Sequence, residues 1–363
     1  MAVTSGSTGL RNRPAIRDGA LRPQQAAYVL TQGLRVGWYW GQKLAASARS
    51  DPGPPRTRDA RRLPGRARLL GDLRRLLARD WANIAAGSYD MPAGLLPNPA
   101  AALRRMRRFF SDLPQVEARR HAGDAGAVAR QPDTAGYPRY YLQNFHFQSD
   151  GWLSAESAAL YDHQVEVLFG GAADAMRRQA LVPIGREVAR LGVRQTGLLD
   201  LGCGTGRFLR EIKANYPRMT VTALDLSPFY LDAARRLLAP WSRCGFVVAP
   251  AESIPLAPAS IDIVTATYLF HELPPHQRRR TAGEIARVLR PGGLFVLLDT
   301  LQLGDEPDYD ALLRMFPRRF HEPYYAGYVR SDLARLFTGT GLAIEESTLA
   351  YLSKLTTFRK AHA

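Results

Sequence analysis

Three glycines at alternate positions are the most informative feature of this sequence of 363 residues. Gly202, Gly204 and Gly206 follow residues 198–201, an apolar run that has the character of a buried strand with one acid in it. A helix-like stretch begins directly after them, at Arg207. A strand, a glycine turn and a helix form the first unit of a nucleotide-binding α/β fold, because glycine lets the backbone lie against a ligand.

The spacing of the glycines and the position of the next acid narrow the type of ligand. In a dinucleotide fingerprint the third glycine comes three residues after the second, whereas position 207 here is Arg. Asp225 lies in the next apolar run, 221–226, about 20 residues past the glycines, where an acid suits bidentate hydrogen bonding to ribose hydroxyls. The pattern therefore favours a nucleoside-bearing cofactor and disfavours a nicotinamide dinucleotide.

The run Asp-Leu-Gly-Cys-Gly-Thr-Gly at 200–206, with the acid at 225, resembles class I S-adenosylmethionine-dependent methyltransferases. Three later segments are similar to the family in the same order: the segment beside the adenine (250–255), the fourth strand (261–264), and the helix, Pro-Gly-Gly turn and fifth strand (284–295). Pro291 is expected to end that helix. The resemblance implies an α/β fold with a Rossmann-like seven-stranded, mostly parallel sheet and an antiparallel final hairpin over 342–358.

The resemblance also implies S-adenosyl-L-methionine as the cofactor, held at strand ends and in the loops that follow them. No spacing typical of metal ligands is visible in the sequence, and we expect no metal. The residues expected to bind the cofactor are Asp200, Gly202, Gly204, Gly206, Asp225, Leu226, Ala251, Glu252 and Tyr268.

Aromatic and hydrogen-bonding side chains are dense in residues 137–161, without a helical period. In the methyltransferase family that the sequence resembles, the chain before the first strand often folds over the active site. Insertions after the fifth strand commonly complete the acceptor pocket. We therefore expect the acceptor site between segments 137–148, 268–272 and 321–328. The alternative is that the aromatic rings only pack these segments onto the sheet. The candidate pocket residues are Tyr140, Tyr141, Asn144, His146, Gln148, His321 and Tyr325.

His271 follows the fourth strand, at the edge of the sheet where ligands bind in such folds. Methyl transfer needs a base only if the acceptor must lose a proton, and a histidine with a near-neutral pKa suits that task. His271 is thus the candidate catalytic residue. The alternative is a structural histidine that bonds the loop backbone. Its neighbour Glu272 either orients it or caps the next helix.

Positive charge is concentrated in the N-terminal part of the chain. Residues 1–150 contain 24 Lys and Arg against 11 Asp and Glu, whereas the whole chain has a net charge of +16. Such a segment binds nucleic acid or an anionic membrane surface, or is simply a solvated basic surface. We expect a basic arm and linker over 1–66, with an amphipathic helix at 24–48, and a loosely organised helical region over 67–136. That region has helices at 68–82 and 99–110 and irregular chain over 111–136.

The sequence thus predicts a methyltransferase domain over 137–358 that acts on a small, lipophilic or aromatic molecule. Two alternatives stay open: an RNA or protein methyltransferase that uses the basic N-terminal arm, and a non-catalytic regulatory module that binds the cofactor. Because the chain has only two cysteines and lacks a run of about 18 apolar residues, we expect a cytoplasmic protein, peripheral at a membrane if the arm binds lipid.

Overall fold

A seven-stranded sheet forms the centre of the protein in the computed structural model, which describes residues 18–50, 63–92, 94, 98–131 and 134–362. The strand order is β3-β2-β1-β4-β5-β7-β6. Six strands run in the same direction, and β7 runs opposite to them. The strands are β1 (Gly197–Leu201), β2 (Thr220–Asp225), β3 (Cys244–Val248), β4 (Ile261–Thr267), β5 (Leu289–Thr300), β6 (Leu342–Ala350) and β7 (Ser353–Lys360). The predicted fold class, including the final antiparallel hairpin, is confirmed.

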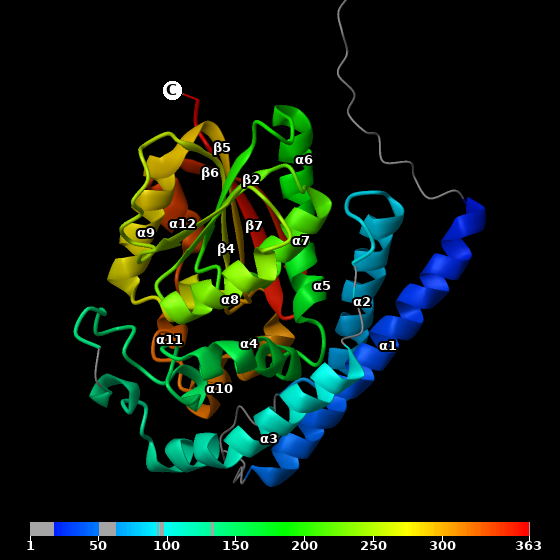
Figure 1. Ribbon diagram of the computed structural model, residues 1–363, viewed down its shortest axis with the longest axis vertical. Coiled ribbons are helices and arrows are strands. Elements are labelled where there is room, and N and C mark those ends of the chain that lie inside the picture. The colour runs from blue at the N-terminus through cyan, green and yellow to red at the C-terminus, as the bar shows by residue number, and fades with distance from the viewer. Residues whose placement is uncertain (1–17, 51–62, 93, 95–97, 132–133, 363) are drawn as a thin grey trace, which may run out of the picture.

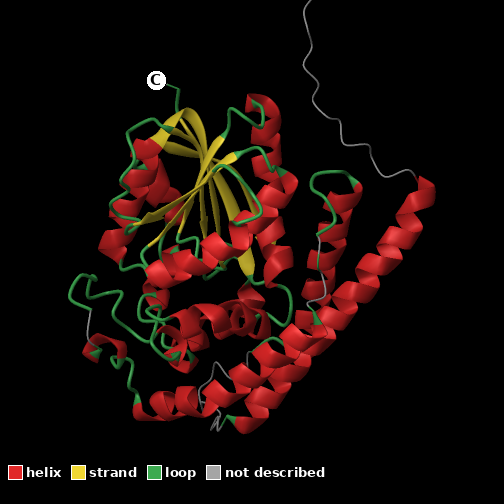
Figure 2. Cartoon of the chain, viewed as in Figure 1, coloured by secondary structure: helices red, strands yellow, loops and turns green. Residues whose placement is uncertain are grey.

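Helices cover both faces of the sheet because the strands are apolar on both sides (Figures 1 and 2). Leu198 packs in one core cluster and its neighbour Leu199 in the other, as the alternation of side chains along a strand requires. The helices on one face are α6 (Leu181–Leu191), α7 (Arg207–Asn215) and α8 (Pro228–Leu238), and those on the other are α9 (Pro275–Val288) and α12 (Leu333–Thr338).

The helix before the fifth strand ends earlier than the sequence suggested. α9 ends at Val288, and Leu289 already has an extended backbone and pairs with Ile261 of β4. Pro291 therefore lies inside the long strand β5, at a point where the register with β4 shifts. A proline is tolerated at such an irregularity because the ladder hydrogen bond is already interrupted there.

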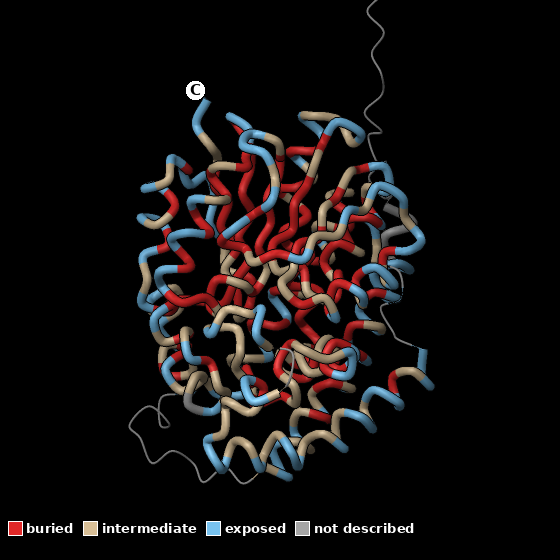
Figure 3. Tube along the Cα trace, turned by 60° about the vertical axis from the view of Figure 1, so that its left-hand side comes forward, coloured by how far each residue is buried: buried red, intermediate tan, exposed pale blue. Residues whose placement is uncertain are grey.

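The carboxyl ends of the parallel strands face a layer of short helices (Figure 1). Buried residues follow the strands, and exposed residues lie on the outer helices (Figure 3). Through this layer the N-terminal helices join the rest of the protein. The layer comprises α4 (Ala155–Leu168), α5 (Ala173–Arg178), α10 (Asp310–Arg319) and α11 (Tyr325–Tyr328), with single turns η3 (Phe145–Phe147) and η4 (Phe270–Glu272).

Three helices precede this layer: α1 (Asp18–Arg49), α2 (Arg66–Ala85) and α3 (Pro99–Ala122). The predicted helices are present, but the expectation of irregular chain over 111–136 is wrong for its first part, since α3 continues to Ala122. Arg119 explains the extension, because it bonds the Phe147 carbonyl at 2.8 Å and the Ser149 hydroxyl at 2.7 Å. Gly123, in the left-handed region at φ 64°, then ends the helix.

The N-terminal helices are also packed more closely than expected. Arg35 of α1 is buried and pairs with Glu166 of α4 and Asp174 of α5. Asp174 in turn accepts hydrogen bonds from Arg207, the first residue of the helix after the glycine turn. A fully buried carboxylate, Asp80 of α2, accepts a further hydrogen bond from Tyr28 of α1. Buried charge pairs of this kind fix how helices dock, because leaving one member unpaired is costly.

The long N-terminal helix is basic and partly apolar, but it does not have the character of a membrane span. Across the part of the chain that the structure describes, no helix combines the length and hydropathy needed to cross a bilayer.

Candidate functional site

The glycine turn between β1 and α7 adopts a backbone that glycine favours. Gly202, Gly204 and Gly206 all have positive φ, at 62°, 56° and 79°. A Cβ on Gly206 would lie 2.9 Å from the Cβ of Ala234 in α8, so the helix packs directly on the turn. The turn thus lies at the carboxyl edge of the sheet, fixed by the packing of α8 and by the backbone hydrogen bonds that Cys203 and Gly206 donate.

Asp225 stands at the end of β2, beside this turn. Its carboxylate accepts hydrogen bonds from the backbone N–H of Gly204 and of Ser227, both at 2.8 Å. Burial raises the pKa of Asp225 to about 6, although these backbone bonds oppose the shift. The carboxylate therefore both shapes the turn and keeps acceptor capacity, since two oxygens offer about four acceptor sites.

Asp200 differs from the other predicted cofactor residues because it lies inside the sheet. It is buried in β1 and accepts a 2.6 Å hydrogen bond from the Thr265 hydroxyl of β4. Burial raises its pKa to about 7. Its contacts indicate that it braces the strand that carries the turn.

A cavity of about 90 Å³, partly open to solvent, lies beside the glycine turn and among aromatic rings. Trp152, Tyr161 and Tyr230 form its aromatic corner, with ring centroids 5.4–5.5 Å apart and edge-to-face packing. The cavity is lined by Tyr140, Tyr141, Phe145, Trp152, Tyr161, Gly202, Gly204, Leu224, Asp225, Leu226, Tyr230, Ala249, Pro250, Ala251, Thr267, Tyr268, Leu269, Glu272 and Leu273.

The segment before α4 lies beside this cavity, and Tyr140 connects it to the loop after β3. Tyr140 donates a 2.7 Å hydrogen bond from its hydroxyl to Glu252 Oε1, which follows β3. The second oxygen, Glu252 Oε2, is buried without a hydrogen-bond partner in the described part of the chain. A buried acceptor that lacks a donor is costly, so a donor of a bound molecule is expected to complete it.

The three segments expected to share an acceptor site lie together. His146 donates its backbone N–H to the carbonyl of His321 at 3.1 Å, which joins the first segment to the third. Arg278 of α9 joins the second to the third, because it donates to the carbonyls of Phe270 at 2.9 Å and Tyr324 at 2.7 Å. Gln143 adds a side-chain link to Tyr324 at 2.8 Å.

His271 is held away from the cavity by Asp299 of β5. Its Nδ1 lies 2.6 Å from Asp299 Oδ1, and the ring is buried. Burial alone would lower the pKa of His271, but the charge and hydrogen bond of Asp299 outweigh it and raise the pKa to about 9. A charged imidazolium has no free lone pair at neutral pH, so this geometry favours the structural alternative for His271.

Not all the predicted residues line the cavity. Asn144 is buried and bonds the chain around it, accepting from Val128 N–H and donating to the Gln148 carbonyl. Gln148 donates to the Gly151 carbonyl. His321 bonds Gln143, and Tyr325 packs its edge against His271. The lining residues Tyr140, Tyr141, Gly202, Gly204, Asp225, Leu226, Ala251 and Tyr268 come from the predicted sets, whereas Asp200, Gly206, Glu252, Asn144, His146, Gln148, His271, His321 and Tyr325 lie outside the lining.

Four aromatic lining residues, Phe145, Trp152, Tyr161 and Tyr230, were missed as candidates. Trp152 and Tyr161 belong to the aromatic stretch that the sequence singled out, so its density was a usable signal. Tyr230 gave no such signal, because it lies in an ordinary amphipathic helix and reaches the cavity only through the docking of α8.

Known proteins resemble the cofactor half of this chain. Residues 198–293 match the profile of a methyltransferase domain. A malonyl-[acyl-carrier protein] O-methyltransferase of Methylococcus capsulatus is 33% identical over 135 residues, which are 36% of this chain and 48% of that one. A ubiquinone/menaquinone biosynthesis C-methyltransferase of Syntrophotalea carbinolica is 35% identical, over 35% of this chain and 52% of that one.

An O-methyltransferase of Aspergillus nomiae is 32% identical over 162 residues, which are 43% of this chain and 68% of that one. The chain thus spans about half to two thirds of the length of these curated relatives. The chain belongs to the class I S-adenosylmethionine-dependent methyltransferases, because it matches the methyltransferase-domain profile and the Aspergillus nomiae enzyme and has the glycine turn and the sheet topology of the family. The cofactor of this family is S-adenosyl-L-methionine.

The residues of the cavity fit this cofactor. Gly202 and Gly204 line the cavity without side chains, and a Cβ at position 202 would lie 3.0 Å from Leu269, which is itself a lining residue. The unpartnered Glu252 Oε2 suits the exocyclic amine of an adenine. Asp225 offers carboxylate oxygens for ribose hydroxyls, and aromatic faces nearby favour a sulfonium cation.

Proposed function

We propose that this protein transfers a methyl group from S-adenosyl-L-methionine to a small molecule with a lipophilic or aromatic body. The observation that carries the proposal is the cavity itself, which is lined both by the glycine turn and by the aromatic corner of Trp152, Tyr161 and Tyr230. Ligand sites for small molecules have this composition of apolar walls with a few polar groups.

The proposed cofactor contacts are shared among the two acids and the glycine turn. Asp225 holds the ribose hydroxyls, Glu252 takes the adenine amine, and Gly202 and Gly204 leave space along the backbone. Leu226 and Ala251 supply apolar walls beside them, as their place in the cavity lining supports. Tyr268 closes the floor, and its hydroxyl is fixed by a 2.8 Å hydrogen bond with the Ser353 hydroxyl.

The chemistry of the step needs little from the protein beyond alignment. When bound, the cofactor supplies a methyl carbon that a lone pair of the acceptor attacks as the carbon–sulfur bond breaks and the sulfonium becomes a thioether. The chain contributes by fixing both molecules in line and excluding water, which lowers the barrier by roughly 7–11 kcal/mol in well-oriented systems. Tyr140 and Tyr141 on the covering segment exclude water from the cavity.

The alternative of an RNA or protein methyltransferase depends on the basic N-terminal arm. Among the described residues, none before Tyr140 lines the cavity, so α1, α2 and α3 do not reach the acceptor space. This arrangement favours the small-molecule acceptor, because a macromolecule guided by the arm would have to extend past the covering segment.

The proposal is tested with the full-length protein and cofactor labelled in the methyl group. Separate reactions contain a panel of small aromatic and lipophilic acceptors, bulk RNA, or a protein extract. The Asp225→Ala variant serves as the control that is deficient in cofactor binding. We expect label only in small-molecule products of the unmodified protein. Label confined to RNA or protein, or intact cofactor binding with no transfer to any acceptor, would overturn the proposal.

A further inference from the structure

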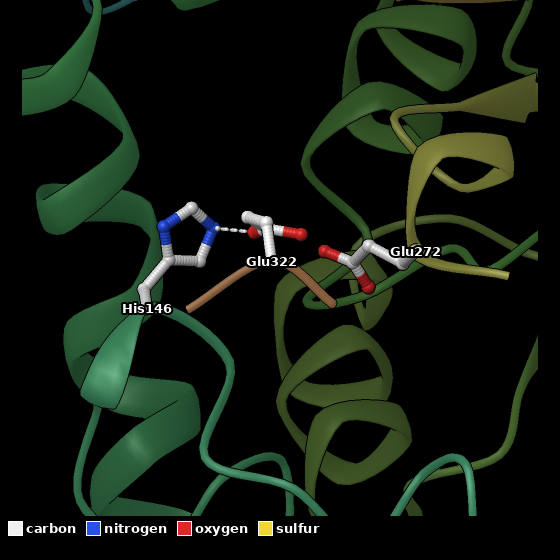
Figure 4. A group of neighbouring side chains, drawn as sticks. All are labelled: His146, Glu272 and Glu322. Atoms are coloured by element: carbon white, nitrogen blue, oxygen red, sulfur yellow. Dashed lines mark ion pairs between the residues drawn. The ribbon is translucent and has the colours of Figure 1, made fainter. Parts of the chain in front are cut away.

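Three side chains that could bind a metal meet at the wall of the cavity, one from each of the three segments described above. They are His146 of η3, Glu272 of η4 and Glu322, which precedes α11. One ligand atom from each lies within 4.8 Å of the other two. Figure 4 shows the Glu322 carboxyl between the imidazole of His146 and the carboxyl of Glu272, with the ion pair to His146 drawn as a dashed line.

Glu322 is the second, independent observation that points to a ligand. The residue is 2% exposed, and neither carboxylate oxygen has a hydrogen-bond partner in the described part of the chain. The imidazole of His146 lies beside it, with Nε2 2.8 Å from Oε1. A carboxylate removed from water without hydrogen bonds is expensive, so it is normally paired, protonated or bound to a metal.

The surrounding charges do not neutralise the two carboxylates. His271 lies 3.8 Å from Glu272 Oε1, but its charge is already matched by Asp299. Arg278, the nearest guanidinium on α9, donates to the carbonyls of Phe270 and Tyr324. Over the residues that the structure describes, neither Glu272 nor Glu322 forms an ion pair with Lys or Arg.

The electrostatics agree with this excess of negative charge. Burial raises the pKa of Glu272 well above its ordinary value, and the charges of Glu322 and Asp299 add to the shift against the opposing charge of His271. A divalent cation would relieve the same repulsion that otherwise drives protonation.

We propose that His146 Nε2 and one oxygen from each of Glu272 and Glu322 bind a divalent first-row transition cation, with Mn²⁺ and Zn²⁺ as the best fits. One imidazole with two carboxylates suits these ions, whereas Mg²⁺ and Ca²⁺ prefer oxygen ligands alone. Three protein ligands leave further coordination positions open, as in catalytic rather than structural metal sites.

One ligand of the site, Glu272, borders the proposed acceptor space. Glu272 lines the cavity, and the side chains of His146 and Glu272 keep 25% and 17% of their surface exposed, whereas that of Glu322 keeps none. Resting on the proposed function, the site favours acceptors that carry an oxygen donor able to complete the coordination of the cation.

The experiment titrates full-length protein, stripped with a chelator, with MnCl₂ or ZnCl₂ in a calorimeter, without cofactor or acceptor. We expect one site per chain with micromolar or tighter affinity, weakened at least tenfold in Glu322→Gln and in His146→Gln. The electron paramagnetic resonance signal of free Mn²⁺ should also disappear when the unmodified protein is added, and it should persist when either variant is added. Glu156→Gln and His276→Gln, at exposed positions on α4 and α9, are matched controls that should bind like the unmodified protein.

Several outcomes would overturn the site. If both cations bind with affinities weaker than millimolar, the cluster is not a metal site. If Glu322→Gln does not fold, His146→Gln, at the half-exposed ligand, decides the question alone. Cation binding is measured without cofactor, so a lack of cation binding would not bear on the proposed methyl transfer. Conversely, if Asp225→Ala loses methyl transfer and still binds the cation, the metal site stands independently of the proposed function.

Discussion

Tyr140 and Glu252 lie 112 residues apart in the chain and are joined by a 2.7 Å hydrogen bond across the mouth of the cavity. This contact is the one side-chain bond by which Tyr140 holds the covering segment to the loop after β3 within the described structure. The covering segment and the adenine side of the site are therefore coupled, and bound cofactor should leave more slowly while this bond is intact.

The Tyr140→Phe variant removes the bond and keeps the ring. Hydrogen bonds to charged groups contribute about 1.5–3 kcal/mol, so we expect the dissociation rate of S-adenosylhomocysteine to rise about 10- to 100-fold, measured by stopped-flow displacement. Tyr137→Phe is the matched control, since Tyr137 contacts the segment mainly by stacking on Tyr141 with centroids 5.8 Å apart. An unchanged dissociation rate in Tyr140→Phe would show that the segment does not retain the cofactor.

Asp225 provides the sharpest test of cofactor binding. Asp225→Ala removes the acceptor for the ribose hydroxyls and also frees the backbone N–H of Gly204 and Ser227. With two charge-assisted hydrogen bonds lost at about 1.5–3 kcal/mol each, calorimetry should show cofactor affinity reduced by two orders of magnitude or more. Nicotinamide dinucleotides should fail to bind either protein. Unchanged affinity in the variant would exclude Asp225 from the site.

The pKa of Asp225 predicts that cofactor affinity and stability respond to pH in opposite directions. Since its folded pKa is raised from 3.8 to about 6, the folded state binds more protons than the unfolded state between these values. Its contribution to the free energy of unfolding therefore rises as pH falls from 6 toward 4. Over the same range protonation removes the charge that holds the ribose, so affinity should fall. Asp225→Asn removes this titration and also the charge that helps to raise the pKa of Asp200, so its pH profile should differ from that of the unmodified protein by both effects together.

The fold and the glycine turn beside Asp225 were predictable because local sequence determines them. The turn at Gly202 needs positive φ, and the acid at Asp225 follows the next strand at a fixed spacing, so both are visible without tertiary knowledge. The cluster of His146 and Glu322 with Glu272 was not predictable as a metal site, because its members have no common spacing and meet only when the loops pack. The end of α3 was also not predictable from local sequence, because the helix continues past its predicted end through tertiary contacts such as that of Arg119 with the Phe147 carbonyl.

His271 is tested by replacing the imidazole with a smaller group. In His271→Ala the buried Asp299 loses its cationic partner, and breaking such a pair costs about 3–5 kcal/mol. We expect a lower melting temperature, cofactor affinity within twofold of the unmodified protein, and a single-turnover rate of the folded variant reduced less than tenfold. A rate reduced 10²- to 10⁴-fold at an unchanged melting temperature would instead identify His271 as the base.

The basic N-terminal region is expected to associate with anionic vesicles through α1. Leu30 and Leu34 of this helix are 64% and 54% exposed, in a region with a large excess of Arg. Cosedimentation with phosphatidylglycerol vesicles should exceed that with phosphatidylcholine and should weaken with salt. Leu30→Gln with Leu34→Gln should reduce it, and Leu70→Gln on α2 is the control. Binding that is absent, or that prefers RNA in the same salt series, would remove the membrane from the expected partners.

His163 predicts how acid affects the docking of the N-terminal helices. It lies on α4, its Nε2 is 2.8 Å from Gln42 Oε1 of α1, and its ring packs against Tyr39 and Phe109. Burial, with a smaller effect of the positive charge of Arg105, lowers its pKa from 6.5 to about 4. The folded state therefore holds His163 neutral while the unfolded state takes up a proton below 6.5.

The sign of the effect follows from this difference in proton binding. The stability contributed by neutral His163 is fully present above pH 6.5 and is lost as pH falls toward 4, by about 3 kcal/mol in total. Urea unfolding of the unmodified protein and of His163→Gln, which keeps a hydrogen-bonding partner for Gln42 but cannot titrate, should be compared from pH 7.5 to 4.5. The variant is expected to be less stable at pH 7.5, because it loses the ring packing, yet to lose less stability on acidification. Parallel pH profiles for the two proteins would show that His163 is already charged in the folded state, so that its contact with Gln42 does not make the docking of α1 sensitive to acid.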